Sequence, residues 1–235
     1  MIPGTALSFS MRGVPGGTVT MPDGSSVEVG AFRMGETEVT WDLYDVFVYN
    51  LDEKEGGEAD AVTRPSKPYI AMDRGFGHAG YPAISMSAKG AASFCEWLSA
   101  KTGKTYRLPT EAEWRHACAL SGIDPDAPGD AAWHKDNADG TTRAVADCPP
   151  DDLGLRGMYG NASEWCEQAD GTFVTIGGTY LDAMSAMGCT TTVPADAAWN
   201  ESDPQFPKSE WWFADAGWVG FRLVCEIDED SDGGE

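Results

Sequence analysis

The octet Arg107-Leu108-Pro109-Thr110-Glu111-Ala112-Glu113-Trp114 contains the clearest helix signal in the chain. It contains a capping box, in which the Thr110 side chain accepts a hydrogen bond from the Glu113 amide and the Glu113 carboxylate accepts one from the Thr110 amide. We therefore expect a helix to begin directly after Thr110. The sequence predicts that this helix ends at Gly122, because glycine favours the left-handed backbone that closes a helix.

Two further helices and two strand regions surround the octet. Apolar residues recur with helical period after Thr40 and again between Ser87 and Gly103. Residues 16–31 read as two strands joined by a turn at residues 22–24. Apolar and polar residues alternate from Phe221 to Ile227, which predicts a final strand. Residues 123–209 show little helical period, so we expect loops and short strands there.

The composition excludes several functional classes. The chain has 235 residues, and 38 acidic side chains against 16 basic ones give a net charge of −22. Such a charge repels phosphates and argues against nucleic acid or an anionic membrane as a partner. There is no run of about 18 apolar residues, so we expect no membrane insertion. At 42% hydrophobic and 11% aromatic, the chain has enough apolar residues for a folded core.

The cysteines and histidines do not form a recognisable metal motif. None of the six cysteines stands in a CxxC or CxxH pair, and the three histidines are not at metal-ligand spacing. Disulfides are therefore the expected use of the cysteines, and they imply an oxidising compartment. The first 17 residues lack the features of a signal peptide. Either a signal has been removed or the protein is cytosolic with free thiols, and we favour an extracytoplasmic location.

Five sequence stretches, in this order along the chain, resemble those of the formylglycine-generating enzyme, or sulfatase-modifying factor, family. They are residues 35–41, residues 81–85 leading into 94–98, the octet, residues 154–165 with Gly160-Asn161-Ala162-Ser163-Glu164-Trp165, and Gly177-Gly178-Thr179-Tyr180 with Gly220-Phe221-Arg222. The resemblance covers about residues 10–227. It implies one α+β domain related to C-type lectins, with about three helices, short mixed or antiparallel sheets and much irregular backbone. We expect this domain at 1–227 and an acidic disordered tail at 228–235.

Copper oxidases of this family carry two cysteines after the glycine turn, and the resemblance locates the corresponding positions here. They hold Asp182 and Met187. Neither is a thiolate, the ligand that Cu(I) prefers, so the resemblance implies a degenerate catalytic site without copper. Cys189 lies two residues beyond the second position and would replace the thiol only if the loop shifted.

The resemblance also suggests disulfide pairs. Family members join the second helix to the last strand, which fits Cys95 with Cys225, and the capped helix to the segment after the copper site, which fits Cys118 with Cys189. Cys148 and Cys166 are then left as a third pair. If Cys189 forms a disulfide, it has no thiolate to offer, and the case for a copper site becomes weaker still.

Structural calcium is a feature of the family near the Gly-Asn-x-x-Glu-Trp turn. Gly160, Ala162 and Glu164 match its ligand positions, whereas Gly157 stands where an Asn or Asp side chain is expected. A second family site begins with an upstream Asn, for which Asn137 and the nearby Asp139 are candidates. Oxygen donors suit Ca²⁺. The alternative is an Asx turn at Asn137, in which the side chain bonds its own backbone.

Three functions remain open at this point. The first is a non-catalytic extracytoplasmic binding or assembly module for a protein, glycan or small molecule. Its expected binding face comprises Asp182, Trp199, Trp211, Trp212, Phe213 and Trp218, because aromatic residues in loops favour ligand contact, although any one of them can instead fill the core. The second is a divergent metal-dependent oxidase that acts on a protein or small molecule. The third is a lectin-like display protein whose late loops vary, as the Ala/Thr/Ser-rich run at 183–198 suggests.

Overall fold

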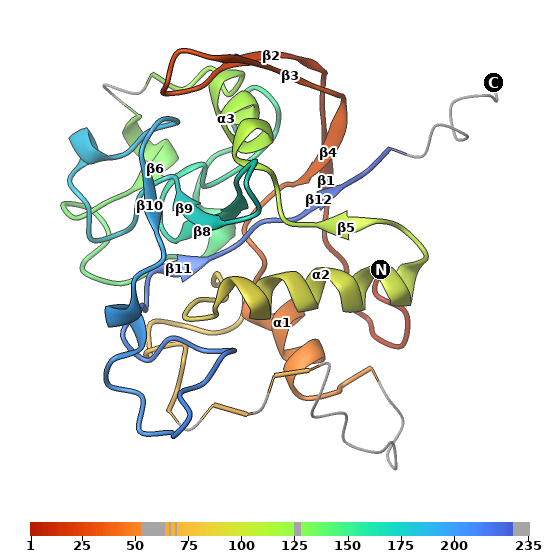
Figure 1. Cartoon of the computed structure of the whole chain (residues 1–235), viewed down its shortest axis with the longest axis vertical. Coiled ribbons are helices and arrows are strands. Elements are labelled where there is room, and N and C mark those ends of the chain that lie inside the picture. Colours follow the sequence, from red (N-terminus) through yellow and green to blue (C-terminus); the bar gives the residue numbers. More distant parts are fainter. Residues whose placement is uncertain (53–63, 66, 69, 125–127, 228–235) are drawn as a thin grey trace.

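A computed structural model describes residues 1–52, 64–65, 67–68, 70–124 and 128–227 (Figure 1). The tail predicted at 228–235 lies outside the described residues. Within them, three α-helices accompany two four-stranded sheets and two two-stranded sheets. The predicted α+β class, with about three helices and short mixed sheets, is confirmed.

Helices α1 (Trp41–Val48) and α2 (Ala88–Thr102) pack together beneath the sheets (Figure 1). The Ser87 side chain caps α2 by accepting from the Gly90 amide at 3.1 Å, and Gly103 ends it with φ 72°. Thr40 precedes α1 in extended backbone without a side-chain cap bond. Helix α2 therefore begins and ends where the sequence places it, and α1 begins directly after Thr40, as predicted.

The first core lies between these helices and the late-chain aromatic residues. Tyr44 of α1 is fully buried, with Trp212 edge-on at 5.7 Å and Phe94 at 5.5 Å between ring centroids. Trp165 and Phe221 belong to the same core. Aromatic side chains bury large apolar areas, which compensates for the scarcity of regular secondary structure.

Helix α3 (Glu111–Ala119) carries the predicted capping box. The Glu113 amide donates to Thr110 Oγ1 at 3.1 Å, and the Thr110 amide donates to Glu113 Oε2 at 2.8 Å. The helix ends at Ala119 instead of the predicted Gly122, because the backbone tightens after it: the Ser121 amide donates to the Cys118 carbonyl at 3.2 Å, three residues back, before Gly122 adopts φ 69°. The antiparallel hairpin of β2 (Gly17–Thr20) and β3 (Ser26–Val29) covers α3 and forms a second core with it (Figure 1).

One four-stranded sheet contains strands from both the beginning and the end of the chain. Its order is β1-β4-β12-β5, with β1 at Met11–Val14, β4 at Phe32–Gly35, β12 at Val224–Cys225 and β5 at Tyr106–Arg107. The predicted alternation along the final strand is wrong, since Arg222 and Val224 are as deeply buried as Phe221 and Leu223. Both faces of this segment are covered, and only two of its residues form strand.

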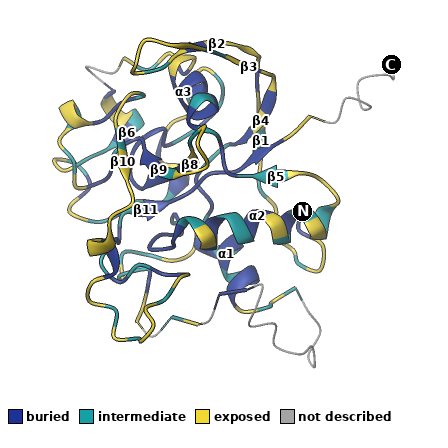
Figure 2. Ribbon diagram, viewed as in Figure 1, coloured by how far each residue is buried: buried dark blue, intermediate teal, exposed yellow. Residues whose placement is uncertain are grey.

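The other four-stranded sheet positions the glycine turn that follows β9. Its order is β10-β9-β8-β11, with β10 at Thr192–Pro194, β9 at Phe173–Ile176, β8 at Ser163–Glu167 and β11 at Val219–Gly220. Strand β11 pairs in parallel with β8, and the other pairs are antiparallel. Figure 2 shows that β8 is mostly buried whereas the edge strand β10 is mostly exposed. A short parallel pair, β6 (Ala132–Trp133) with β7 (Tyr159–Gly160), leads into β8.

Candidate functional site

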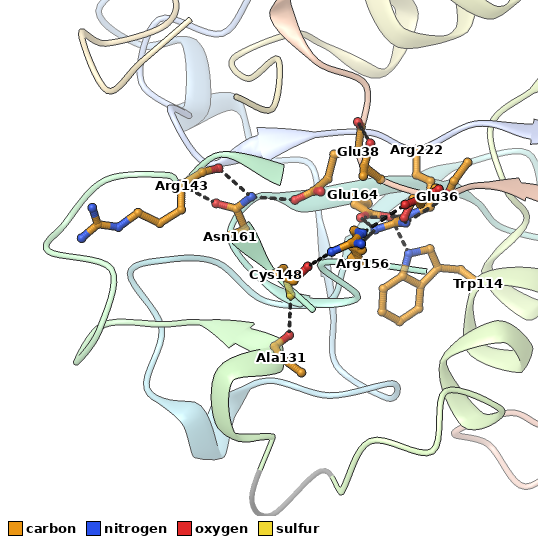
Figure 3. Close-up of polar contacts among 12 residues, drawn as sticks. Glu36, Glu38, Trp114, Ala131, Arg143, Cys148, Arg156, Asn161, Glu164 and Arg222 are labelled. Atoms are coloured by element: carbon orange, nitrogen blue, oxygen red, sulfur yellow. Dashed lines mark hydrogen bonds and ion pairs between the residues drawn. The ribbon is translucent and has the colours of Figure 1, made fainter. Parts of the chain in front are cut away.

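A buried polar network brings four of the quoted motifs together (Figure 3). Arg222 is fully buried and donates to the Glu164 carboxylate from Nη2 at 2.8 Å and from Nε at 3.0 Å. The Trp114 indole donates to Glu164 Oε2 at 2.7 Å. Arg222 also donates to the carbonyls of Gly35 and Arg156 at 3.0 and 2.7 Å. A buried ion pair is tolerated when its remaining donors and acceptors are satisfied, as they are here, so these motifs carry the fold.

A second carboxylate lies beside this ion pair. Glu38 Oε1 accepts from Asn161 Nδ2 at 2.8 Å, while Oε2 is buried without a hydrogen-bond partner (Figure 3). Burial raises the pKa of Glu38 to about 7, an effect that Arg222 opposes and Glu164 reinforces. Gly157 makes room for this carboxylate, because a Cβ there would lie 2.9 Å from Oε2.

The residues considered for calcium have other partners in this structure. Donors from Arg222 and Trp114 take up both oxygens of Glu164. The Asn137 side chain accepts from the His134 amide at 2.7 Å and donates to the Ala132 carbonyl at 2.9 Å. Both partners lie upstream of Asn137, so these bonds are not those of the alternative Asx turn, in which the side chain bonds the backbone two residues further on. Asp139 is ion-paired with Arg143. This donor set does not fit a calcium ion as it stands. Calcium stays a prediction from the resemblance, which an isothermal titration at millimolar Ca²⁺ tests.

Asp182 and Met187, at the two positions where the family's copper oxidases carry cysteines, have structural roles in this protein. Asp182 Oδ2 accepts from both the amide and the hydroxyl of Thr179 at 2.8 Å, which closes the turn after Gly178. Met187 is 7% exposed, and its side chain packs directly over Gly178. A carboxylate and a thioether do not replace two thiolates, so the residues present do not fit Cu(I). In the part of the chain that the structure describes, no group of three or more His, Cys, Asp or Glu residues is placed to hold a metal ion.

The cysteines confirm one predicted bridge and correct two. Cys118 of α3 is bonded to Cys189, so Cys189 offers no thiolate. The predicted bridges Cys95–Cys225 and Cys148–Cys166 are wrong.

Each of these four cysteines has surroundings of its own. Cys148 donates to the Ala131 carbonyl at 3.1 Å (Figure 3), whereas Cys166 is buried in the second core. Cys95 lies on α2 in the first core, and the sheet register pairs Cys225 with Tyr106 of β5. Burial raises the pKa of the Cys148 thiol to about 11, which keeps it unreactive.

A cavity of about 360 Å³ opens beside the glycine turn and brings together parts of β8, β9 and β10 with the aromatic loop residues. Its size lies within the range of about 300–1,000 Å³ that is typical of ligand pockets. Its walls combine apolar and aromatic side chains with hydroxyl groups and one carboxylate. They are Ser163, Thr175, Ile176, Gly178, Thr179, Leu181, Asp182, Ala186, Thr191, Val193, Trp199 and Trp218.

The structure divides the predicted binding face into two groups. Asp182, Trp199 and Trp218 line the cavity. Trp211, Trp212 and Phe213 do not line it. Trp212 packs against Tyr44 in the first core, and Phe213 packs against Trp165 and Trp199. Trp199 belongs to the same core but also borders the cavity.

Sequence reasoning missed other cavity residues, among them Ser163, Thr175 and Val193. Ser163 lies inside the quoted Gly-Asn-Ala-Ser-Glu-Trp turn, which was a usable signal. The strands that carry Thr175 and Val193 are too short for their faces to be read from alternation.

Comparisons with known proteins agree with this architecture. Residues 8–227 match the family model described as the sulfatase-modifying factor enzyme 1-like domain. Treponema denticola variable protein 1 superposes with a TM-score of 0.67 at 20% identity, over 95% of this chain and 97% of that chain. PvdO from Pseudomonas aeruginosa superposes with a TM-score of 0.63, also at 20% identity, over 96% and 99%. Such identities show the fold alone.

A further similarity covers a short stretch of sequence. The serine/threonine-protein kinase pkn1 of Chlamydia pneumoniae is 35% identical over 94 residues, which make up 39% of this chain. The chain spans only 14% of the length of that kinase.

Among the described residues, no helix combines the length and apolarity needed to cross a bilayer.

Proposed function

Because this chain belongs to the sulfatase-modifying factor enzyme 1-like family, whose fold does not by itself fix an activity, we propose from its site that it is a non-catalytic binding module. The observation that carries the proposal is the structural role of two side chains. Asp182 closes a turn and Met187 is buried in the core, at the positions where the copper oxidases of this family have thiols. The cavity beside them is the proposed ligand site.

The walls of the cavity support binding of a small molecule, a glycan or a protein side chain. Aromatic and apolar surface supplies the contact area, and a few polar groups orient the ligand, as in most ligand pockets. Leu181 and Val193 line the cavity and are 46% and 48% exposed, which provides apolar surface at the molecular boundary.

An extracytoplasmic location is part of this proposal. The Cys118–Cys189 disulfide supports it, since structural disulfides form and persist in oxidising compartments. The other cysteines are buried, which protects their sulfur atoms from oxidants.

A cavity-filling variant tests the proposal. Ala186 is an exposed cavity residue, so Ala186→Phe fills the cavity without entering the core. Ala195→Phe is the matched control at an exposed alanine that does not line the cavity. Wild type and both variants are incubated with a library of small molecules and glycans, and retained compounds are identified by mass spectrometry. We expect some compounds to be retained by wild type and by Ala195→Phe but not by Ala186→Phe. Equal retention by all three proteins contradicts it.

A variable display role is the second candidate. Most residues between 181 and 198 are exposed, and several of them line the cavity, so substitutions there would change the ligand without disturbing the core. Sequencing further copies of the gene tests this role. Differences confined to residues 181–198 support it, and differences spread evenly along the chain contradict it.

A further inference from the structure

We propose that the cavity binds an organic cation, namely an ammonium or guanidinium group on an apolar stem. This inference rests on the proposed function, because it names the chemical class of the ligand at the same site. It is carried by three features of the cavity walls: the sign of their charge, the orientation of their hydroxyl groups and their aromatic faces.

Asp182 is the one charged residue that lines the cavity in the described part of the chain. Its bonds to the Thr179 amide and hydroxyl both end on Oδ2, so Oδ1 is the oxygen left to accept from a ligand. A carboxylate without a neighbouring basic side chain in the same cavity favours a positive ligand and disfavours an anion. Charge-assisted hydrogen bonds of this kind are about twice as strong as neutral ones.

Three of the four hydroxyl groups that line the cavity, those of Ser163, Thr175 and Thr179, offer acceptors rather than donors. Ser163 donates to the Trp218 carbonyl and Thr175 to the Val193 carbonyl, each at 3.3 Å, while Thr179 donates to Asp182 at 2.8 Å. Each hydroxyl has a single hydrogen, which these bonds already use. The lone pairs that remain on Ser163 and Thr175 suit a ligand rich in N–H donors, as ammonium and guanidinium groups are.

Two indole rings supply the aromatic walls. The Trp199 and Trp218 centroids lie 6.2 Å apart, and the ring planes make an angle of 79°. Trp165 and Phe213 contact Trp199 from other sides, each at 5.8 Å between centroids, and hold its ring in place. The face of an indole ring attracts cations, and it also packs well against an apolar stem. The net charge of −22 further concentrates cations near the surface.

A matched pair of probes tests the inference. The n-butylammonium ion and n-butanol share an apolar stem and differ in charge, so titrations of both followed by ligand-observed NMR isolate the effect of the charge. We expect the cation to bind about 10-fold more tightly than the alcohol. Asp182→Asn keeps an oxygen that accepts from Thr179 and removes the charge, so this preference should fall to about twofold or less.

Asp136→Asn is the matched control. The Asp136 side chain is 80% exposed and does not line the cavity, so this variant removes one negative charge from the protein, as Asp182→Asn does, and should keep the preference. Trp218→Leu removes one aromatic wall and leaves the carboxylate. It should weaken binding of the cation more than binding of the alcohol, which provides a second test if Asp182→Asn does not fold.

The ammonium group has two possible sources, and a blocked Gly-Lys-Gly peptide distinguishes them. Tighter binding of the peptide than of n-butylammonium indicates a lysine side chain of a partner protein, and the reverse indicates a small amine. Equal affinities for cation and alcohol overturn the inference, as do equal losses in Asp182→Asn and Asp136→Asn or no saturable binding of any cation. If Ala186→Phe still releases a neutral library compound in those cases, the proposed function stands and only the cation is wrong.

Discussion

Glu38 should make the stability of this protein fall as pH rises through neutrality. Its carboxyl is buried beside Glu164, and its pKa lies near 7 instead of the usual 4.5. The folded protein therefore binds a proton more tightly than the unfolded chain does. This stabilisation is complete below pH 4.5 and is lost as pH rises to about 7. At about 1.4 kcal/mol for each pKa unit, the loss amounts to about 3 kcal/mol.

Urea unfolding of wild type and Glu38→Gln between pH 4 and pH 8.5, followed by tryptophan fluorescence, measures this effect. Glutamine does not titrate, so the free energy of unfolding of Glu38→Gln relative to wild type should increase by about 3 kcal/mol across this range. The amide also places a donor where Oε2 lacks a partner, but that cost is the same at every pH and cancels in the comparison.

Glu36→Gln is the control, with the opposite sign. Burial alone would raise the pKa of Glu36, but hydrogen bonds and attraction from Arg156 and Arg12 lower it overall. Its stabilisation is therefore present above the unfolded pKa and lost as pH falls, so Glu36→Gln should differ from wild type in slope only on the acid side. Parallel pH profiles for wild type and Glu38→Gln would refute the assignment of a neutral buried carboxyl to Glu38.

Three further predictions concern the core and the disulfide. Alkylation and intact mass analysis should find Cys118 and Cys189 oxidised, and their replacement by alanine should lower the free energy of unfolding by about 2–4 kcal/mol; an unchanged urea midpoint would be inconsistent with the bridge. Met187→Ala should cost about 2–4 kcal/mol in urea unfolding because the thioether packs on Gly178, whereas a cost below about 0.5 kcal/mol would place it outside the core. Trp212→Ala should cost at least about 3 kcal/mol or abolish folding, as judged by circular dichroism, and a stable variant would show that this ring is not part of the core.

The parts of the fold that local chemistry determines were predictable from the sequence. The capping box at Thr110 and Glu113 needs only residues three apart, and it forms as predicted. The same holds for the Ser87 cap and the closing Gly103. The order of the five motifs indicated the architecture, and the network around Arg222 explains why four of them occur together: they supply each other's buried partners.

The cavity and the roles of the late tryptophans could not be predicted in the same way. Trp199 and Trp212 both belong to the first core, yet Trp199 also lines the cavity whereas Trp212 packs against Trp41 and Tyr44 of α1. That difference depends on contacts between distant segments. The cysteine pairs depend likewise on which sulfur atoms the fold brings together, and only Cys118 and Cys189 meet. The helix end at Ala119 was missed because a tighter turn, closed by the bond from the Ser121 amide to the Cys118 carbonyl, precedes Gly122.

Asp182 closes a turn and Met187 is buried at the two positions where related copper oxidases carry thiols. We propose that the protein therefore has a ligand cavity beside these residues and no copper site. A competition titration of the native, disulfide-intact protein against a Cu(I) chelator tests it most directly. We expect the protein to retain no more Cu(I) than its Met187→Leu variant does. Retention of one Cu(I) per protein that is lost in Asp182→Ala or Met187→Leu would contradict the account and favour an oxidase.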